Sequence, residues 1–171
     1  RVRMGAGTGI KPPTAFEIAF TDNPSLQPER SRSIDVCIEH ARRGGAVVVD
    51  ATWFANRYDH LIVAVGSSLS GASRYRTDNI ANARARGLEL GATWRASRGL
   101  VARAGWTWMD TAVLAVDSLP GHAPAPFAVG DPLLRRATHQ GSAEVAWSGA
   151  RAGAIVAVNG RGRVADFEPN F

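Results

Sequence analysis

Few residues in the sequence have the types and spacing that catalysis or metal binding requires. The four histidines are dispersed, and none takes part in the His-Glu-x-x-His spacing that binds zinc. Ser68 and Ser70 lie in a glycine-flanked loop without the pattern that exposes a nucleophilic serine. Glu39 and His40 could act as an acid–base pair, but beside a tight turn such a pair is more often a solvated strand end. We therefore predict that the chain is not an enzyme and has no metal site.

Phosphate binding is the other chemistry that a short motif suggests. Gly5, Gly7 and Gly9 form a Gly-x-Gly-x-Gly run. A dinucleotide site needs such a run between a strand and a helix, and here Pro12 and Pro13 follow instead. We expect no dinucleotide and no other cofactor.

Charge and composition narrow the class of protein. The formal net charge is +5 and the pI about 10.6, but the arginines are scattered, and Lys11 is the only lysine. This distribution argues against a nucleic-acid partner. The single cysteine, Cys37, excludes an internal disulfide. Mean hydropathy is -0.11, and no apolar run reaches the length of about 18 residues that a membrane-spanning helix needs.

The elements that must position any site are almost all strands. Residues 46–65 alternate between an apolar side and a polar side that holds Asp50, Thr52 and Asn56. Such alternation is typical of a strand with two different faces. Residues 1–6 are interpreted as a short lead-in, and we predict further strands over 31–43, 80–97, 100–111, 133–149 and 152–167.

The connections between these strands are sorted by length. Short ones at Gly44-Gly45, Arg98-Gly99 and Gly149-Ala150 alternate with long ones over 66–79 and 112–132. Transmembrane β-barrels have short turns on one side of the membrane and long loops on the other. We predict an all-β fold: an antiparallel, up-and-down transmembrane β-barrel segment, with about seven strands of a larger barrel and not closed on its own.

The two faces of the predicted strands differ in the way that a barrel in lipid requires. All five tryptophans fall on the apolar side, as residues of an interfacial girdle do. The alternative is that they fill the core of a soluble β-sandwich. Charged residues on the polar side could line a lumen or form a cross-strand network of paired charges, which we favour. These residues are Asp50, Glu89, Arg95, Arg103 and Glu144.

Strand length indicates where a ligand would bind. A strand over 46–65 would extend for roughly 65 Å, whereas a tilted membrane strand needs only about 9–11 residues. The excess would carry its far end towards the long loops. Aromatic and basic groups there suit large anionic metal chelates, and we select Tyr58, His60, Tyr75, Arg76 and His122 as candidate ligand contacts.

Six segments, taken in order, resemble the barrel of TonB-dependent outer-membrane receptors. "GTGIKPPTAFEIAF" and "NPSLQPERSRSIDV" are similar to the family's Lys-Ala-Pro-Thr and Asn-Pro-x-Leu-x-Pro-Glu segments. "ATWFANRYDHLI", "NIANARARGLELGATW", "GWTWMDT" and "LLRRATH" follow as its later strands do. The matched residues include Lys11, Thr14, Asn23, Leu26, Glu29, Asn79, Gly87, Glu89, Leu133, Arg135, Arg136 and His139.

The resemblance implies a location in the outer membrane of a Gram-negative bacterium, in contact with its lipid. It also implies import of a metal chelate, such as a ferric siderophore, cobalamin or haem, with a plug and a TonB complex as partners. Cys37 and Ala137 depart from the family's glycine and proline, and no plug, TonB box or C-terminal signature strand is recognised. We therefore expect residues 1–171 to be a partial barrel domain that meets TonB only through a missing N-terminal part. The alternatives are a soluble β-sandwich binding module and a non-functional relic of a receptor gene.

Overall fold

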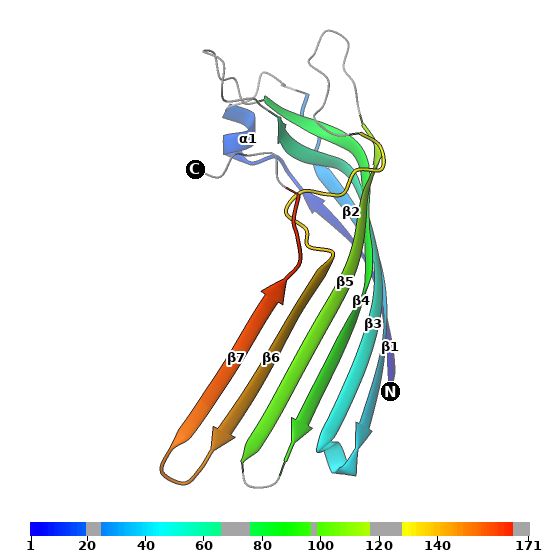
Figure 1. The fold of residues 1–171 in the computed structure, drawn as a ribbon. Helices are drawn as coiled ribbons and strands as arrows, with labels where there is room; N and C mark the ends of the chain where they lie inside the picture. The colour runs from blue at the N-terminus through cyan, green and yellow to red at the C-terminus, as the bar shows by residue number, and fades with distance from the viewer. Residues whose placement is uncertain (20–24, 66–75, 97–98, 117–127, 166–171) are drawn as a thin grey trace.

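The strands form one curved antiparallel sheet in the computed structural model, which describes residues 1–19, 25–65, 76–96, 99–116 and 128–165 (Figure 1). Each strand pairs with its neighbours in the chain, in the order β1 to β7. The elements are β1 (Val2–Lys11), α1 (Ala15–Ala19), β2 (Glu29–Arg42), η1 (Arg43–Gly45), β3 (Val47–Val65), β4 (Arg76–Arg95), β5 (Leu100–Ala115), β6 (His139–Ser148) and β7 (Gly153–Arg161).

This architecture confirms the predicted fold class. The sheet is an up-and-down meander, and β1 and β7 each pair with one neighbour only, so it does not close into a barrel by itself. No second sheet packs against it within the described residues. The soluble β-sandwich alternative is therefore wrong.

One strand was not recognised in the sequence. β1 pairs with β2 along its whole length, whereas only a lead-in over residues 1–6 was expected. Its glycines face polar side chains of β2: a Cβ on Gly5 would lie 2.7 Å from Asp35 Oδ1, and one on Gly9 would lie 2.7 Å from Ser31 Oγ. Since glycine has no side chain, the sequence of β1 does not show the alternation between apolar and polar side chains that identifies a strand. The run Gly5–Gly9 is thus part of a strand and does not form a phosphate loop.

The connections sort to opposite ends of the sheet, as predicted. The short ones, at η1, at 96–99 and at 149–152, lie at one end, which we call the turn end (Figure 1). The long ones, over 12–28, 66–75 and 116–138, leave the strands at the other end, which we call the loop end. Gly44, Gly45 and Gly99 have positive φ angles of 63°, 92° and 76° at the turns, where glycine adopts this conformation without strain.

The pairing register divides the side chains between two faces. All five tryptophans lie on one face, which we call the outer face. Trp53, Trp94 and Trp147 are 45%, 50% and 45% exposed, so they do not meet in a dry core. Acidic side chains such as Asp50 and Glu89 lie on the opposite, inner face. The apolar side of the strands thus points away from any interior.

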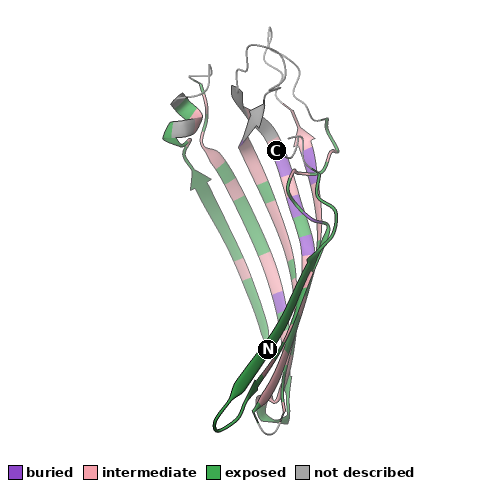
Figure 2. Ribbon diagram, turned by 60° about the vertical axis from the view of Figure 1, so that its left-hand side comes forward, coloured by how far each residue is buried: buried purple, intermediate pink, exposed green. Residues whose placement is uncertain are grey.

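Buried residues gather near the loop end, mainly on β4 and β5 (Figure 2). There the segment 128–138 runs beside the upper part of β5, where β6 has not yet begun. Met109 N–H donates to the Thr138 carbonyl (2.8 Å), and Val113 N–H donates to the Asp131 carbonyl (2.9 Å). The segment helps to enclose this part of the sheet. The buried apolar residues here are Ile62, Ala83, Ala85, Ala112, Val113 and Ala137.

Helices contribute little to the architecture. α1 has five residues, and none of the helices in the described part of the chain is both long and apolar enough to span a membrane.

Candidate binding surface on the inner face

The inner face is hollowed towards the turn end. This hollow has a volume of about 710 Å³, and residues of β3 to β7 line it. Small residues make room for acidic ones: Asp50 lies directly opposite Gly91, and a Cβ on Gly91 would lie 2.8 Å from Asp50 Oδ2. Glu89 and, from β7, Arg161 complete the charged lining. The arrangement is a broad, open surface that presents carboxylates.

All five predicted lumen charges lie on this face, but they are used differently. Arg103 on β5 and Glu144 on β6 are directly opposite and form an ion pair with Nη1 and Oε1 2.5 Å apart. Arg95 instead donates to the Gly45 carbonyl at 3.1 Å. Asp50 and Glu89 take part in none of the ion pairs observed within 4.0 Å among the described residues. One charge pair is therefore a cross-strand pair, while these two carboxylates remain open to the hollow.

A second cavity, of about 370 Å³, lies near the loop end between the sheet and the segment 128–138. Asn56 and Tyr58 of β3 line it from the inner face. Met109 and Leu133 supply apolar surface, and Arg136 adds a positive charge. Apolar walls with a few polar groups are typical of small-molecule sites. This cavity is therefore a candidate for ligand contact.

Glu29 stands at the edge of this cavity and joins three elements. Its Oε1 accepts hydrogen bonds from Lys11 Nζ at the end of β1 (3.2 Å) and from the Ile62 backbone N–H on β3 (3.0 Å). Lys11 also lies 3.3 Å from Glu17 of α1. The carboxylate therefore ties the first strand and α1 to the upper part of the sheet.

A capping box starts α1. Thr14 Oγ1 accepts from the Glu17 N–H (3.2 Å), while Glu17 Oε2 accepts from the Thr14 N–H (2.6 Å). Burial tends to raise the pKa of Glu17. The hydrogen bonds from Thr14 and the charge of Lys11 outweigh that effect, so the pKa lies below its ordinary value.

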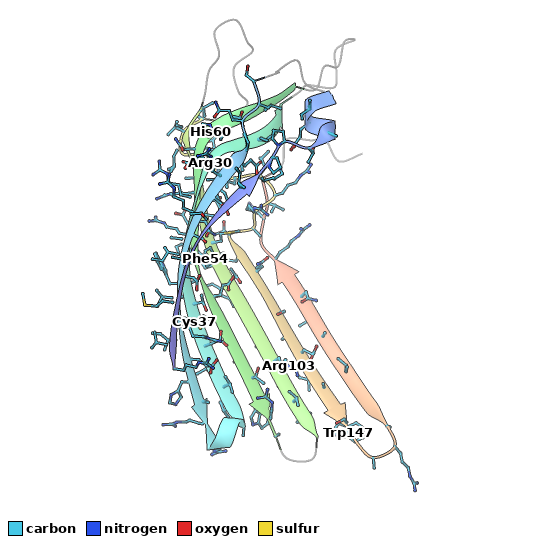
Figure 3. All side chains as sticks on the ribbon, turned by 180° about the vertical axis from the view of Figure 1, so that it is seen from behind. Arg30, Cys37, Phe54, His60, Arg103 and Trp147 are labelled. Atoms are coloured by element: carbon cyan, nitrogen blue, oxygen red, sulfur yellow. The ribbon has the colours of Figure 1, made fainter. Side chains whose placement is uncertain are left out.

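A hydrogen bond from Asn79 fixes the backbone of β3 at His60. His60 has a left-handed φ of 58°, and its carbonyl accepts a hydrogen bond from Asn79 Nδ2 at 2.7 Å. Asn79 also bonds to the backbone of Gln27, accepting from its N–H at 2.9 Å and donating to its carbonyl at 3.0 Å. Figure 3 places His60 near the loop end, far from Arg103 and Trp147. The His60 carbonyl therefore helps to hold β3 and β4 together at this end.

The five predicted ligand contacts are only partly described. Tyr58 lines the loop-end cavity, and His60 is not among its lining residues. Tyr75 and His122 lie outside the described residues, as does the side chain of Arg76 at the start of β4. Their role as ligand contacts stays a prediction.

Several residues at this end were not selected as site residues. Glu29, Leu133 and Arg136 were noted as motif matches, yet all three line the same cavity. Asn79, another match, holds His60. The available signal was the co-occurrence of the motifs, which lie far apart in sequence and meet here. Asn56 carried no signal beyond its position on the polar side of the strand.

No group of three or more His, Cys, Asp or Glu residues that could hold a metal ion occurs in the described part of the chain.

Comparison with known proteins gives a family match over nearly the whole chain. The family model described as "TonB dependent receptor-like, beta-barrel" matches residues 1–170. No curated protein sequence matches the chain.

Solved structures with a similar fold include two metal transporters and one outer-membrane receptor. The copper transporter OprC has a TM-score of 0.71 at 12% identity, covering 92% of this chain and 23% of that chain. The FrpB iron transporter of Neisseria meningitidis (F5-1 variant) has a TM-score of 0.64 at 14% identity, covering 94% and 24%. The alcaligin outer-membrane receptor FauA of Bordetella pertussis has a TM-score of 0.56 at 19% identity, covering 95% and 27%. The chain spans about a quarter of the length of these structures.

Proposed function

The chain belongs to the TonB-dependent receptor-like β-barrel family of the bacterial outer membrane, whose members are transporters and not enzymes, and from this premise we propose that it forms part of the wall of a receptor that imports a metal chelate. Residues 1–171 would be a portion of the barrel domain, and the plug and the TonB-coupling segment would lie outside them. The cargo would be a ferric siderophore, cobalamin or haem.

One observation carries this proposal: a single meander with an apolar outer face, a polar hollowed inner face, and all long connections at one end. Such a wall separates lipid from a watery interior and directs the long loops away from the short turns. The structural neighbours are described as a copper transporter, an iron transporter and an alcaligin outer-membrane receptor, which supports a metal or metal chelate as the cargo class.

The mechanism assigns different tasks to the two ends of the inner face. The cargo binds near the loop end, where Tyr58, Asn56 and Arg136 line the cavity. Rearrangement of a plug, driven by the TonB complex of the inner membrane, then opens the path past the hollow with Asp50 and Glu89. In this scheme the present chain binds and confines the cargo, while the energy enters through the plug.

Uptake measurements test the proposal. Cells lacking the full-length receptor that contains this sequence are compared with complemented cells for uptake of labelled ferric siderophore, cobalamin and haem. We expect receptor-dependent, TonB-dependent uptake of at least one of these, and no uptake when residues 1–171 are supplied alone. Receptor-independent uptake of all three, or uptake by the isolated chain, contradicts the proposal.

A variant pair tests the cavity. Tyr58→Ala should weaken ligand binding by about five- to tenfold, since an aromatic contact is worth about 0.5–1.5 kcal/mol beyond the area that it buries. Trp53→Ala, on the outer face of the same strand, is the matched aromatic control and should leave the affinity unchanged. If both substitutions change the ligand affinity equally, Tyr58 is not a ligand contact.

The remaining alternative is a non-functional relic of a receptor gene. The genomic sequence upstream decides between them: an in-frame plug-encoding segment supports the receptor, and a stop codon supports the relic.

A further inference from the structure

Five arginines form a belt on the outer face, towards the loop end of β2, β3 and β4. The register sets three of them in one row: Arg32 lies directly opposite Arg57, and Arg57 lies directly opposite Arg84. Arg30 and Arg86 flank this row, one step along the strands on either side. Like charges directly opposite on paired strands are destabilising, so the row needs negative charges nearby to offset the repulsion. We refer to Arg30, Arg32, Arg57, Arg84 and Arg86 as the arginine belt.

Carboxylates of the same face compensate the belt only in part. Asp59 lies 3.8 Å from Arg32 and 3.6 Å from Arg57, and Asp110 lies 3.4 Å from Arg84 and 3.0 Å from Arg86. Each aspartate is thus shared between two guanidinium groups. Five arginines face two aspartates among the described side chains of this region, which leaves an excess of three positive charges.

The belt borders the apolar surface directly. On β3 the outer face is apolar from Val47 to Ala55, a length close to the roughly 9–11 residues with which a tilted strand crosses a membrane. Arg57 is the next outer-face residue. On β4, Arg86 is the outer-face residue next to Leu88 on its loop-end side. Figure 3 shows Arg30 near the loop end, above Phe54 and Cys37. The arginines therefore stand where hydrocarbon gives way to headgroups.

The arginine side chains are also accessible from outside. Those of Arg32, Arg57 and Arg86 are 74%, 58% and 50% exposed. At the membrane midplane an arginine on the lipid face is costly, but near the interface the cost falls to about 0–1 kcal/mol. Guanidinium groups bind phosphate through paired hydrogen bonds, more specifically than a lysine would.

We propose that the arginine belt binds the phosphate groups of the glycolipid in the outer leaflet. A phosphate placed over the row of Arg32, Arg57 and Arg84 supplies the missing negative charge and converts their repulsion into a shared attraction. The lipid would thereby fix the depth of this part of the wall. The proposal rests on the outer-membrane location alone, so it stands even if the cargo of the receptor is not a metal chelate.

The test uses the full-length receptor and bisphosphorylated lipid A as the probe. The triple variant R32Q/R57Q/R84Q is compared with R3Q/R95Q/R103Q, a control that removes the same charge from the inner face. Native mass spectrometry after gel filtration in a zwitterionic detergent measures the lipid A retained. We expect the belt variant to retain about tenfold less lipid A than the parent, and the control to retain as much as the parent. Equal retention by the belt variant, or an equal loss in the control, overturns the proposal.

A second measurement guards against a folding defect. In vesicles of phosphatidylcholine alone, Arg57→Gln should leave the unfolding temperature unchanged or raise it, because it relieves repulsion. In vesicles that also contain lipid A, the same substitution should lower it. If the unfolding temperature changes with the same sign in both kinds of vesicle, Arg57 acts through protein contacts. If vesicles that carry an acidic peptide in place of lipid A reproduce the decrease, the partner is a protein. Either result contradicts the proposal.

Discussion

The two ends of the same strands are stabilised by different means. Towards the turn end the sheet is a single layer, and ion pairs such as Arg103–Glu144 are exposed. Towards the loop end the strands carry a buried cluster, and side chains such as Glu29 and Asn79 bind the backbone of neighbouring strands. β3 has 19 residues, more than a bilayer requires. The part of the wall in lipid can leave its apolar side to the membrane, whereas the part above it must supply its own packing.

The largest expected effect contrasts two glycines of the inner face. A Cβ on Gly87, which lies opposite Phe54 near the middle of β4, would collide with the Trp108 carbonyl and lie 2.7 Å from Phe54 Cζ. Gly87→Ala should therefore lower the free energy of unfolding by about 2–3 kcal/mol, the upper part of the usual range for overpacking, because the collision is with backbone. A Cβ on Gly105, towards the turn end, would lie 3.4 Å from Ser142 Oγ and 3.9 Å from the Leu90 carbonyl oxygen, so Gly105→Ala should change the free energy of unfolding by less than about 1 kcal/mol. Urea unfolding in detergent, followed by tryptophan fluorescence, measures both; a loss for Gly105→Ala equal to that for Gly87→Ala would erase the contrast.

Removing the Glu29 carboxylate should have the next largest effect. Glu29→Ala leaves the Ile62 N–H without its acceptor and Lys11 without one of its partners. An unsatisfied, largely buried donor costs about 1–3 kcal/mol. Hydrogen exchange should locate the change in the upper part of β3, with the turn end unaffected. Faster exchange along the entire sheet would show that the two ends do not differ in the way described.

At the turn end, Glu144→Ala should cost little. Its ion pair with Arg103 is exposed on both sides, and such pairs typically contribute less than about 1 kcal/mol. A double-mutant cycle with Arg103→Ala gives the coupling energy directly. A coupling energy as large as the loss of stability for Glu29→Ala would show that the exposed charges of the inner face stabilise the sheet as much as the hydrogen bonds of Glu29 do.

The smallest effect concerns acid. Because the pKa of Glu17 is lowered in the folded chain, its contribution to stability is present above the ordinary glutamate value of 4.5 and is lost as the pH falls through the folded pKa. Exchange of the Ile18 amide, which donates to the Thr14 carbonyl, should become less protected as the pH falls below 4.5 and through the folded pKa of Glu17. Protection at the turn end should not change in parallel; an equal loss there would indicate general acid unfolding.

The sequence predicted the part of the fold that depends on side-chain alternation. β3 was expected over 46–65 and runs from Val47 to Val65, because apolar residues occupy every second position from Val47 to Ala55. β1 was missed because Gly5, Gly7 and Gly9 contribute no side chains to one face. The strand expected from residue 133 begins at His139, because the residues before it run beside the upper part of β5 in irregular form.

The candidate site was less predictable, since it depends on which distant residues the register brings together. Tyr58 could be selected from its residue type and position, and it lines a cavity. The role of Glu29 could not, because its contacts to Lys11 and Ile62 come from two other strands. The arginine belt escaped notice for the same reason: Arg57 alone is one exception on an apolar face, and only the pairing sets it between Arg32 and Arg84.

The order of the strands in space repeats their order along the chain. No strand has to wait for a partner synthesised much later, so the entropy lost in closing each connection stays small. A growing edge can therefore accept one hairpin after another, and duplication or loss of a hairpin would lengthen or shorten the wall without rethreading it.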